Sequence, residues 1–135
     1  MCLPSAPPRD KMIRLNEEKY SGKPEVDMSL IRDISLAPAG ELKISWVERN
    51  MPVLRAIGEE FRRTRPFEGL RVALSVHLEA KTAYLCRVME MGGAEMYVTG
   101  SNPLSTQDDV AAALASGAMQ VFGRHGCDME EYEQC

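Results

Sequence analysis

Short aliphatic runs alternate with helix-forming stretches through the second half of the sequence, and this alternation constrains the fold more than any other feature. The aliphatic runs are residues 70–76, 94–98 and 118–122, and the helix-forming stretches are residues 79–91 and 109–114. Runs of this length, rich in Val and Leu and flanked by glycine, are typical of buried parallel strands. Strands joined by helices in this order predict an α/β fold with a βαβαβ parallel sheet and right-handed crossovers.

The residues before this region predict two helices. Beginning at Leu42, apolar side chains recur every three or four positions along one helical stripe. They are Ile44, Val47, Met51, Leu54, Ile57 and Phe61. Asn50, followed by Pro52 in the first turn, is expected to be the N-cap of a second helix, so two helices meet there. Farther along, residues 105–108 form a capping-box pattern that predicts another helix start, and Gly117 is expected to close that helix.

Length and composition limit the chain to one domain and exclude some classes of partner. The 135 residues are enough for one core and too few for two domains. Residues 1–28 are rich in proline and charge and poor in large aliphatic side chains, so they are expected to form a mobile leader before a domain over residues 29–135. The net charge is −4, without a basic cluster, which excludes nonspecific nucleic-acid binding. No membrane span or secretory signal is visible, so a cytoplasmic protein is expected.

Metal and common nucleotide-binding motifs are not found in the sequence. The four cysteines lack C-x-x-C spacing and are expected to be free thiols: Cys2, Cys86, Cys127 and Cys135. The two histidines, His77 and His125, have no matching ligand spacing, so no metal site is expected. Neither G-x-G-x-x-G nor G-x-x-x-x-G-K-[ST] occurs, which excludes those dinucleotide and triphosphate sites from this chain.

Polar residues follow each predicted strand, and ligands of parallel sheets bind at the carboxyl ends of the strands. These ends are residues 77–79, 99–102 and 123–125, and the first two contain the most polar side chains. His77 is a candidate general acid or base because imidazole titrates near neutrality. The alternative is a strand-end histidine that only caps a nearby carbonyl group. His125 is a weaker candidate because it lies in a glycine-flanked loop.

Two further side chains near these strand ends are suited to binding. Lys81 falls in the first turn of a predicted helix, where a positive charge is slightly unfavourable, which favours a role toward a nearby group. Gln107 offers amide donors and an acceptor, a combination suited to reading the edge of a base. The blander alternative is that residues 106–108 only cap the helix that follows, and that Glu79 only compensates a helix dipole.

The segment SNPLSTQDDVAAAL at residues 101–114 closely resembles a signature of the S-adenosylhomocysteine hydrolases. Other segments agree in the same order: IRDISLAPAGELKISWVERNMPVL at 31–54, GLRVALSVHLEAKTAYL at 69–85, GGAEMYVTGSNP at 92–103 and a terminal EEYEQC. The resemblance extends over residues 29–134. It implies that N-terminal helices precede a Rossmann-like parallel sheet, and that the chain is the N-terminal part of a substrate-binding domain.

Enzymes of this family reversibly hydrolyse S-adenosyl-L-homocysteine to adenosine and L-homocysteine, and they are usually homotetramers. Tightly bound NAD oxidises the 3′-hydroxyl, which acidifies the 4′ proton; homocysteine leaves, water adds, and the ketone is reduced back. The resemblance implies that His77 helps to handle protons at the 5′ carbon. Thr106 and Gln107 are expected beside the purine, and Asn102 and Ser105 are expected to shape that loop. The full set of implied substrate-binding residues is Glu79, Lys81, Asn102, Ser105, Thr106 and Gln107.

One departure from the family pattern concerns the cofactor. The family's G-x-G-x-x-G motif and later catalytic residues would fall beyond Cys135, so NAD is expected to bind a domain that is absent from this chain. The 135-residue chain alone is therefore expected to be inactive, as a fragment of a longer enzyme. The alternative is a truncated, noncatalytic relative that binds a nucleoside.

A second departure is Lys81, where many family members have an acid or Gln. A carboxylate accepts a hydrogen bond from the 6-amino group of adenine, whereas Lys only donates and suits the 6-oxo group of hypoxanthine. S-inosyl-L-homocysteine is therefore an alternative substrate. The competing explanation is that Glu79 pairs with Lys81 while Gln107 reads the amino group. Some members resemble the Lys-bearing pattern, so adenosine remains the first expectation.

Overall fold

The computed structural model describes residues 29–128 and residue 130, so the expected leader over residues 1–28 and the end of the terminal motif lie outside the described residues. Three parallel strands form one sheet in the order β1 (Arg71–Val76), β2 (Glu95–Gly100) and β3 (Gln120–Phe122). Helix α4 (Ala80–Met91) connects β1 to β2, and α5 (Asp108–Ala115) connects β2 to β3. The predicted α/β fold with a βαβαβ parallel sheet is confirmed.

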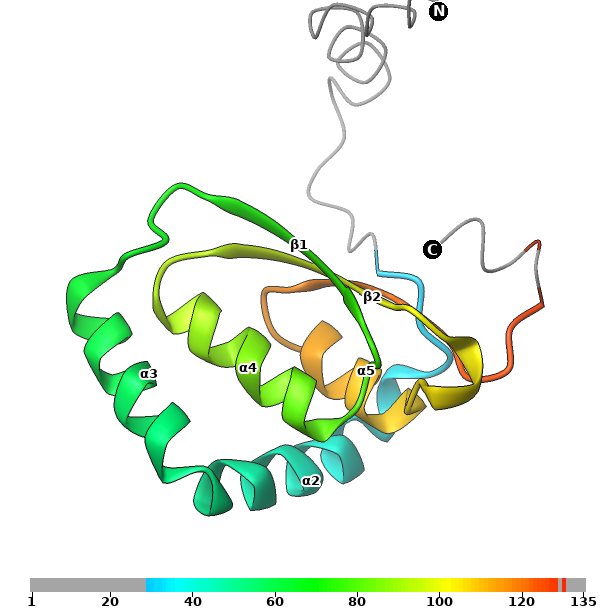
Figure 1. Ribbon diagram of the computed structural model, residues 1–135. Helices are drawn as coiled ribbons and strands as arrows, with labels where there is room; N and C mark the ends of the chain where they lie inside the picture. The colour runs from blue at the N-terminus through cyan, green and yellow to red at the C-terminus, as the bar shows by residue number, and fades with distance from the viewer. Residues whose placement is uncertain (1–28, 129, 131–135) are drawn as a thin grey trace, which may run out of the picture.

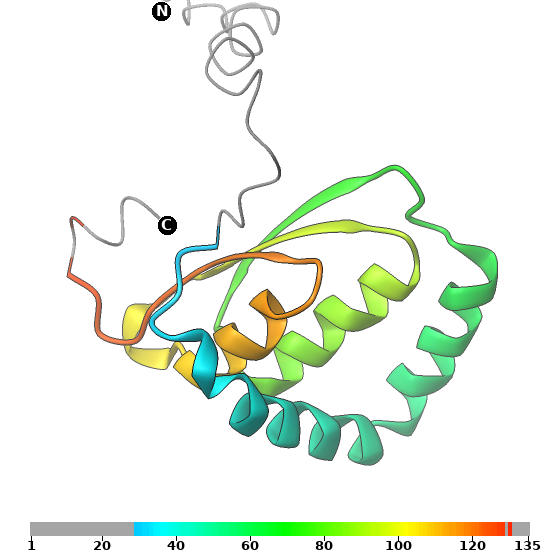
Figure 2. The same cartoon turned by 180° about the vertical axis from the view of Figure 1, so that it is seen from behind.

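Helices α2 to α5 lie on one side of this sheet, as both views show (Figures 1 and 2). The chain passes through a short 3-10 helix, η1 (Ile34–Leu36), into α2 (Ala37–Asn50) and then α3 (Pro52–Thr64). Helices α4 and α5 pack against the strands, α2 crosses their outer side, and α3 packs beside α4. None of the helices in the described part of the chain is long and apolar enough to cross a lipid bilayer.

The core lies between the sheet and these helices. Met96, Val98 and Val121 point from the strands into it, and Ile44 and Val47 contribute from the predicted stripe on α2. Every residue of α5 from position 110 to 115 is buried, because this helix is covered by the sheet on one side and by α2 on the other.

The prediction that the first strand is buried is wrong. Along β1 the residues alternate between exposed and half-buried, and Val76 is 44% exposed. The reason is that β1 is an edge strand and that, in the described residues, helices cover only one face of the sheet. On the other face Tyr97 and Phe122 line a shallow hollow of about 260 Å³.

Two expected helix caps differ from the structure. Asn50 is the last residue of α2, and its side chain donates to the carbonyl of Trp46, whereas Met51 is the N-cap of α3. The two helices do meet there, as predicted. The capping box at residues 105–108 is wrong, since Ser105 ends a second 3-10 helix, η2 (Pro103–Ser105), and α5 begins three residues later. The turn of η2 is held by Asn102, whose side-chain oxygen accepts from the backbone N–H of Leu104 and whose carbonyl accepts from the backbone N–H of Ser105. Gly117 closes α5 as expected: the helix ends at Ala115 with Ser116 as its C-cap, and the N–H of Gly117 donates to the carbonyl of Leu114 at 3.1 Å.

Helices α2 and α5 cross at Gly40, where the two backbones almost touch. A Cβ atom at this position would lie 1.9 Å from the carbonyl oxygen of Asp109, so only glycine fits without moving a helix. This close approach brings the polar side of α2 next to the first turn of α5. It therefore positions part of the candidate site described below.

Candidate functional site

The loops at the carboxyl ends of the strands come together, as the topology predicts. His77 directly follows β1, and its Nδ1 lies 2.6 Å from the hydroxyl of Ser105, which belongs to the loop after β2. The His77 side chain is exposed and that of Ser105 is half-buried. The contact joins two candidate residues that are 28 positions apart in the sequence.

Asn102 organises the loop between β2 and α5. Its side-chain oxygen accepts from the backbone N–H of Leu104 at 2.9 Å. Its backbone carbonyl accepts from the hydroxyls of Ser105 and Thr106, at 3.0 and 3.1 Å. Thr106 is only 3% exposed, so its side chain is part of the loop's interior, and its expected place beside a purine stays a prediction.

A cavity of about 500 Å³ opens beside this loop and gathers three of the expected substrate-binding residues. Glu79 and Lys81 reach it from the start of α4, and Gln107 reaches it from the N-cap of α5. Helix α2 forms most of the remaining wall, and Ala80 at the start of α4 completes it. The α2 residues are Leu42, Lys43, Trp46 and Val47. Apolar walls with a few polar groups are typical of small-molecule sites.

Lys43 is a site residue that the sequence did not reveal. Its ammonium group lies 3.2 Å from the amide oxygen of Gln107 and 2.7 Å from a carboxylate oxygen of Asp109. With its oxygen held by Lys43, the Gln107 amide keeps its two N–H donors for other partners. The sequence signal that could have found this wall is the pair Leu42 and Trp46, apolar residues four positions apart that fall outside the stripe of Ile44 and Val47. In the structure they are 74% and 60% exposed.

The ion pair between Glu79 and Lys81 that the competing explanation requires is not formed. Instead, Glu79 caps α4, because its carboxylate accepts from the backbone N–H of Thr82 at 3.2 Å. Among residues 29–128 and 130, no ion pair or hydrogen bond engages the Lys81 ammonium group. The cavity therefore presents Lys81 as a donor and the second oxygen of Glu79 as an acceptor. No group of three or more His, Cys, Asp or Glu side chains in this described range is arranged as metal ligands.

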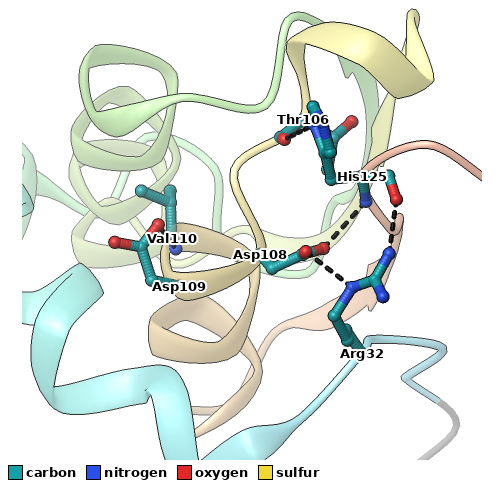
Figure 3. A network of polar contacts seen from close by, with 6 residues as sticks. All are labelled: Arg32, Thr106, Asp108, Asp109, Val110 and His125. Carbon is teal, nitrogen blue, oxygen red and sulfur yellow. Dashed lines mark hydrogen bonds and ion pairs between the residues drawn. The ribbon is translucent and has the colours of Figure 1, made fainter.

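A second polar network holds the start of α5 from the opposite side (Figure 3). Asp108 accepts from the Arg32 guanidinium at 2.7 Å and from the backbone N–H of His125 at 2.8 Å. The His125 ring contacts the carbonyl of Thr106 through Nδ1 at 2.9 Å. His125, the weaker candidate from the sequence, thus contacts the backbone of the loop that supplies Gln107.

Comparison with known proteins identifies the family of this chain. The family model described as S-adenosyl-L-homocysteine hydrolase matches residues 28–135. The chain belongs to this family. Among individual relatives, it is 53% identical over 105 residues to the S-inosyl-L-homocysteine hydrolase of Methanococcus maripaludis, an alignment of 78% of this chain and 25% of that protein. It is 52% identical over 102 residues to the adenosylhomocysteinase of Thermococcus kodakarensis, covering 76% and 24%.

A third relative, the adenosylhomocysteinase of Thermotoga maritima, is 52% identical over 95 residues, covering 70% of this chain and 24% of that protein. The chain thus spans about a quarter of the length of the curated relatives that it matches. The family resemblance that the signature segment predicted is therefore confirmed. Relatives named for an adenosyl substrate and for an inosyl substrate match it about equally, so overall identity does not distinguish the two purines.

Proposed function

We propose that this chain supplies the purine-binding part of an adenosylhomocysteinase, which reversibly hydrolyses S-adenosyl-L-homocysteine to adenosine and L-homocysteine. The observation that carries the proposal is the convergence of Glu79, Lys81 and Gln107 on one cavity in a chain of this family. The apolar side chains of Leu42 and Trp46 suit the faces of a purine, and the polar groups suit its edge.

His77 is the residue that we assign to proton handling at the 5′ carbon. It follows β1 at the carboxyl edge of the sheet, where its exposed ring can meet a ligand. Asn102 and Ser105 hold the facing loop in one shape through the hydrogen bonds described above. Thr106 is buried in that loop, and the next residue, Gln107, lines the cavity.

Hydrolysis of S-inosyl-L-homocysteine is the second candidate, and the donors in the cavity favour it. Lys81 can only donate, and the amide oxygen of Gln107 is already held by Lys43. Both side chains therefore offer protons, which suits the 6-oxo group of hypoxanthine. The free oxygen of Glu79 is the acceptor that suits the 6-amino group of adenine. A truncated relative that binds a nucleoside without turnover is the remaining alternative.

The residues described here do not fit a dinucleotide. In parallel α/β sheets the pyrophosphate lies against a glycine-rich turn at a helix N-terminus. Here Glu79 caps the N-terminus of α4, and Asp108 and Asp109 occupy the first turn of α5. Carboxylates at both positions would repel a pyrophosphate. We therefore place NAD on a part of the enzyme other than this chain, and we expect no turnover from the chain alone. A cytoplasmic homotetramer belongs to the same proposal and rests on the family resemblance.

Calorimetric titration of the chain with adenosine, inosine and their homocysteine conjugates tests the proposal. Tighter binding of adenosine and its homocysteine conjugate supports the adenosyl substrate. Tighter binding of inosine and its conjugate supports the inosyl substrate. Lys81→Gln should shift the preference toward adenine, because an amide can accept from the amino group. Arg63→Gln is the matched control, since this exposed arginine lies on α3, away from the cavity. Absence of binding for all four ligands would contradict the proposal.

A further inference from the structure

The contact between His77 and Ser105 indicates which ring nitrogen of His77 carries the proton. The serine hydroxyl lies 2.6 Å from Nδ1 of His77 and 3.0 Å from the carbonyl oxygen of Asn102. A hydroxyl has one proton to donate, and a carbonyl oxygen can only accept. Both contacts are hydrogen bonds at the same time only if Ser105 donates to Asn102 and accepts from an N–H on His77.

We propose that Ser105 is a positioning residue that fixes His77 in the Nδ1–H tautomer and leaves Nε2 unprotonated. If Ser105 instead donated to His77, its oxygen would face the Asn102 carbonyl oxygen at 3.0 Å with lone pairs opposed. The Asn102 carbonyl also accepts from the backbone N–H of Ser105 and from the hydroxyl of Thr106, both at 3.1 Å, so it is fixed in place by the 3-10 turn and the residue that follows it. The loop after β2 thus sets the state of a side chain that follows β1.

The consequence for chemistry concerns which nitrogen can accept a proton. A neutral ring with a bare Nε2 can take a proton there and become an imidazolium, and Nδ1 keeps its proton and its bond to Ser105. A ring protonated at Nε2 cannot act as a base at that atom. This consequence rests on the proposed function, whereas the tautomer itself rests only on the geometry of His77, Ser105 and Asn102.

Two-bond proton–nitrogen NMR correlations of the full chain, recorded at alkaline pH where imidazoles are neutral, distinguish the two tautomers. The chain has two histidines, and His125 is an internal reference because its Nδ1 faces the Thr106 carbonyl, which only accepts. We expect the Nδ1–H pattern for both rings. Ser105→Ala should lose this pattern for His77 and keep it for His125, and Ser105→Thr should restore it.

An Nε2–H pattern for His77 in the unmodified chain would overturn the proposal, and so would an unchanged pattern in a folded Ser105→Ala chain. The unmodified chain decides the question by itself if the alanine variant does not fold, as judged from the His125 signals and circular dichroism. The two proposals can fail separately. If calorimetry detects no nucleoside binding but NMR shows the expected tautomer, the proposed function is contradicted and this inference stands.

Discussion

Asp108 accepts a hydrogen bond from the guanidinium of Arg32 at 2.7 Å, although the two residues are 76 positions apart. The same carboxylate accepts the backbone N–H of His125. One side chain thus ties the segment before α2, the start of α5 and the loop after β3 together (Figure 3). Because Gln107 precedes Asp108, this tie also fixes one wall of the cavity.

Removing this tie should cost stability. Asp108→Ala deletes both bonds, and hydrogen bonds to a carboxylate that is only 17% exposed are worth about 1–3 kcal/mol in total. Chemical denaturation should show that loss in the free energy of unfolding. Glu60→Ala, on the exposed face of α3, is the control and should change it by less than about 0.5 kcal/mol. Equal effects of the two substitutions would show that the network adds nothing.

Lys43 should affect binding through Gln107. Lys43→Met removes the bond that holds the amide oxygen, so the amide can turn, and we expect nucleoside binding weaker by about 1 kcal/mol, or roughly five-fold. Arg49→Met is the control, because it removes the same charge from an exposed position on the same helix. Calorimetry with the nucleoside that the unmodified chain prefers measures the effect. Identical binding by both variants would argue against a role for Lys43.

The crossing of α2 and α5 should tolerate no side chain at Gly40. Gly40→Ala places a methyl group against the Asp109 carbonyl at 1.9 Å, and the helices must separate, at a cost of about 3 kcal/mol or more. Gly117→Ala is the matched control, since its nearest contact is 3.4 Å and its backbone needs no glycine. Thermal unfolding should show a large decrease for the first and little change for the second. A stable Gly40→Ala chain would mean that the helices can part without penalty.

The ion pair between Arg87 on α4 and Glu41 on α2 should make stability depend on acidity. The Arg87 hydrogen bonds lower the pKa of Glu41 from its ordinary 4.5, and burial opposes this effect. A lowered pKa means that the stabilisation is complete above 4.5 and is lost as the pH falls through the lowered value. Because Glu41 is half-exposed, the contribution is at most about 1 kcal/mol.

Glu41→Gln should therefore destabilise the chain at neutral pH, and the difference from the unmodified chain should vanish in acid. Urea unfolding at a series of pH values measures this difference. A destabilisation that stayed constant down to the acid end would indicate that packing, and not the charge of Glu41, is responsible.

The Cys86 thiol should be inert in the folded chain. Burial raises its pKa to about 12, and the residue has no exposed surface, so almost no thiolate is present at neutral pH. A disulfide reagent followed by peptide mapping should modify the half-buried Cys127 before Cys86, and Cys86 only after urea is added. Modification of both at similar rates without urea would show that α4 opens readily.

Much of the fold was predictable because its signals are local. The alternation of aliphatic runs with helix-forming stretches predicted the parallel sheet, and the position of Pro52 predicted where two helices meet. The strand ends predicted that His77 and the loop of Asn102 and Ser105 come together, since carboxyl ends of parallel strands share an edge. The signature segment predicted the family.

Cap positions and burial were predicted less well. The polar residues 105–108 read as a capping box, but the hydroxyl of Ser105 bonds with the nearby carbonyl of Asn102 and with His77, and no local pattern encodes the contact with His77. The aliphatic run of β1 read as buried, but burial depends on which elements cover each face of the sheet.

By itself the sequence determined the order and type of the main helices and strands, because spacing and turn residues act over a few positions. Only the tertiary structure decided that Lys43 holds Gln107, that Arg32 holds Asp108, and that Glu79 caps a helix and does not pair with Lys81. The first two contacts join residues more than sixty positions apart, and they depend on how α2 and the segment before it pack against the start of α5.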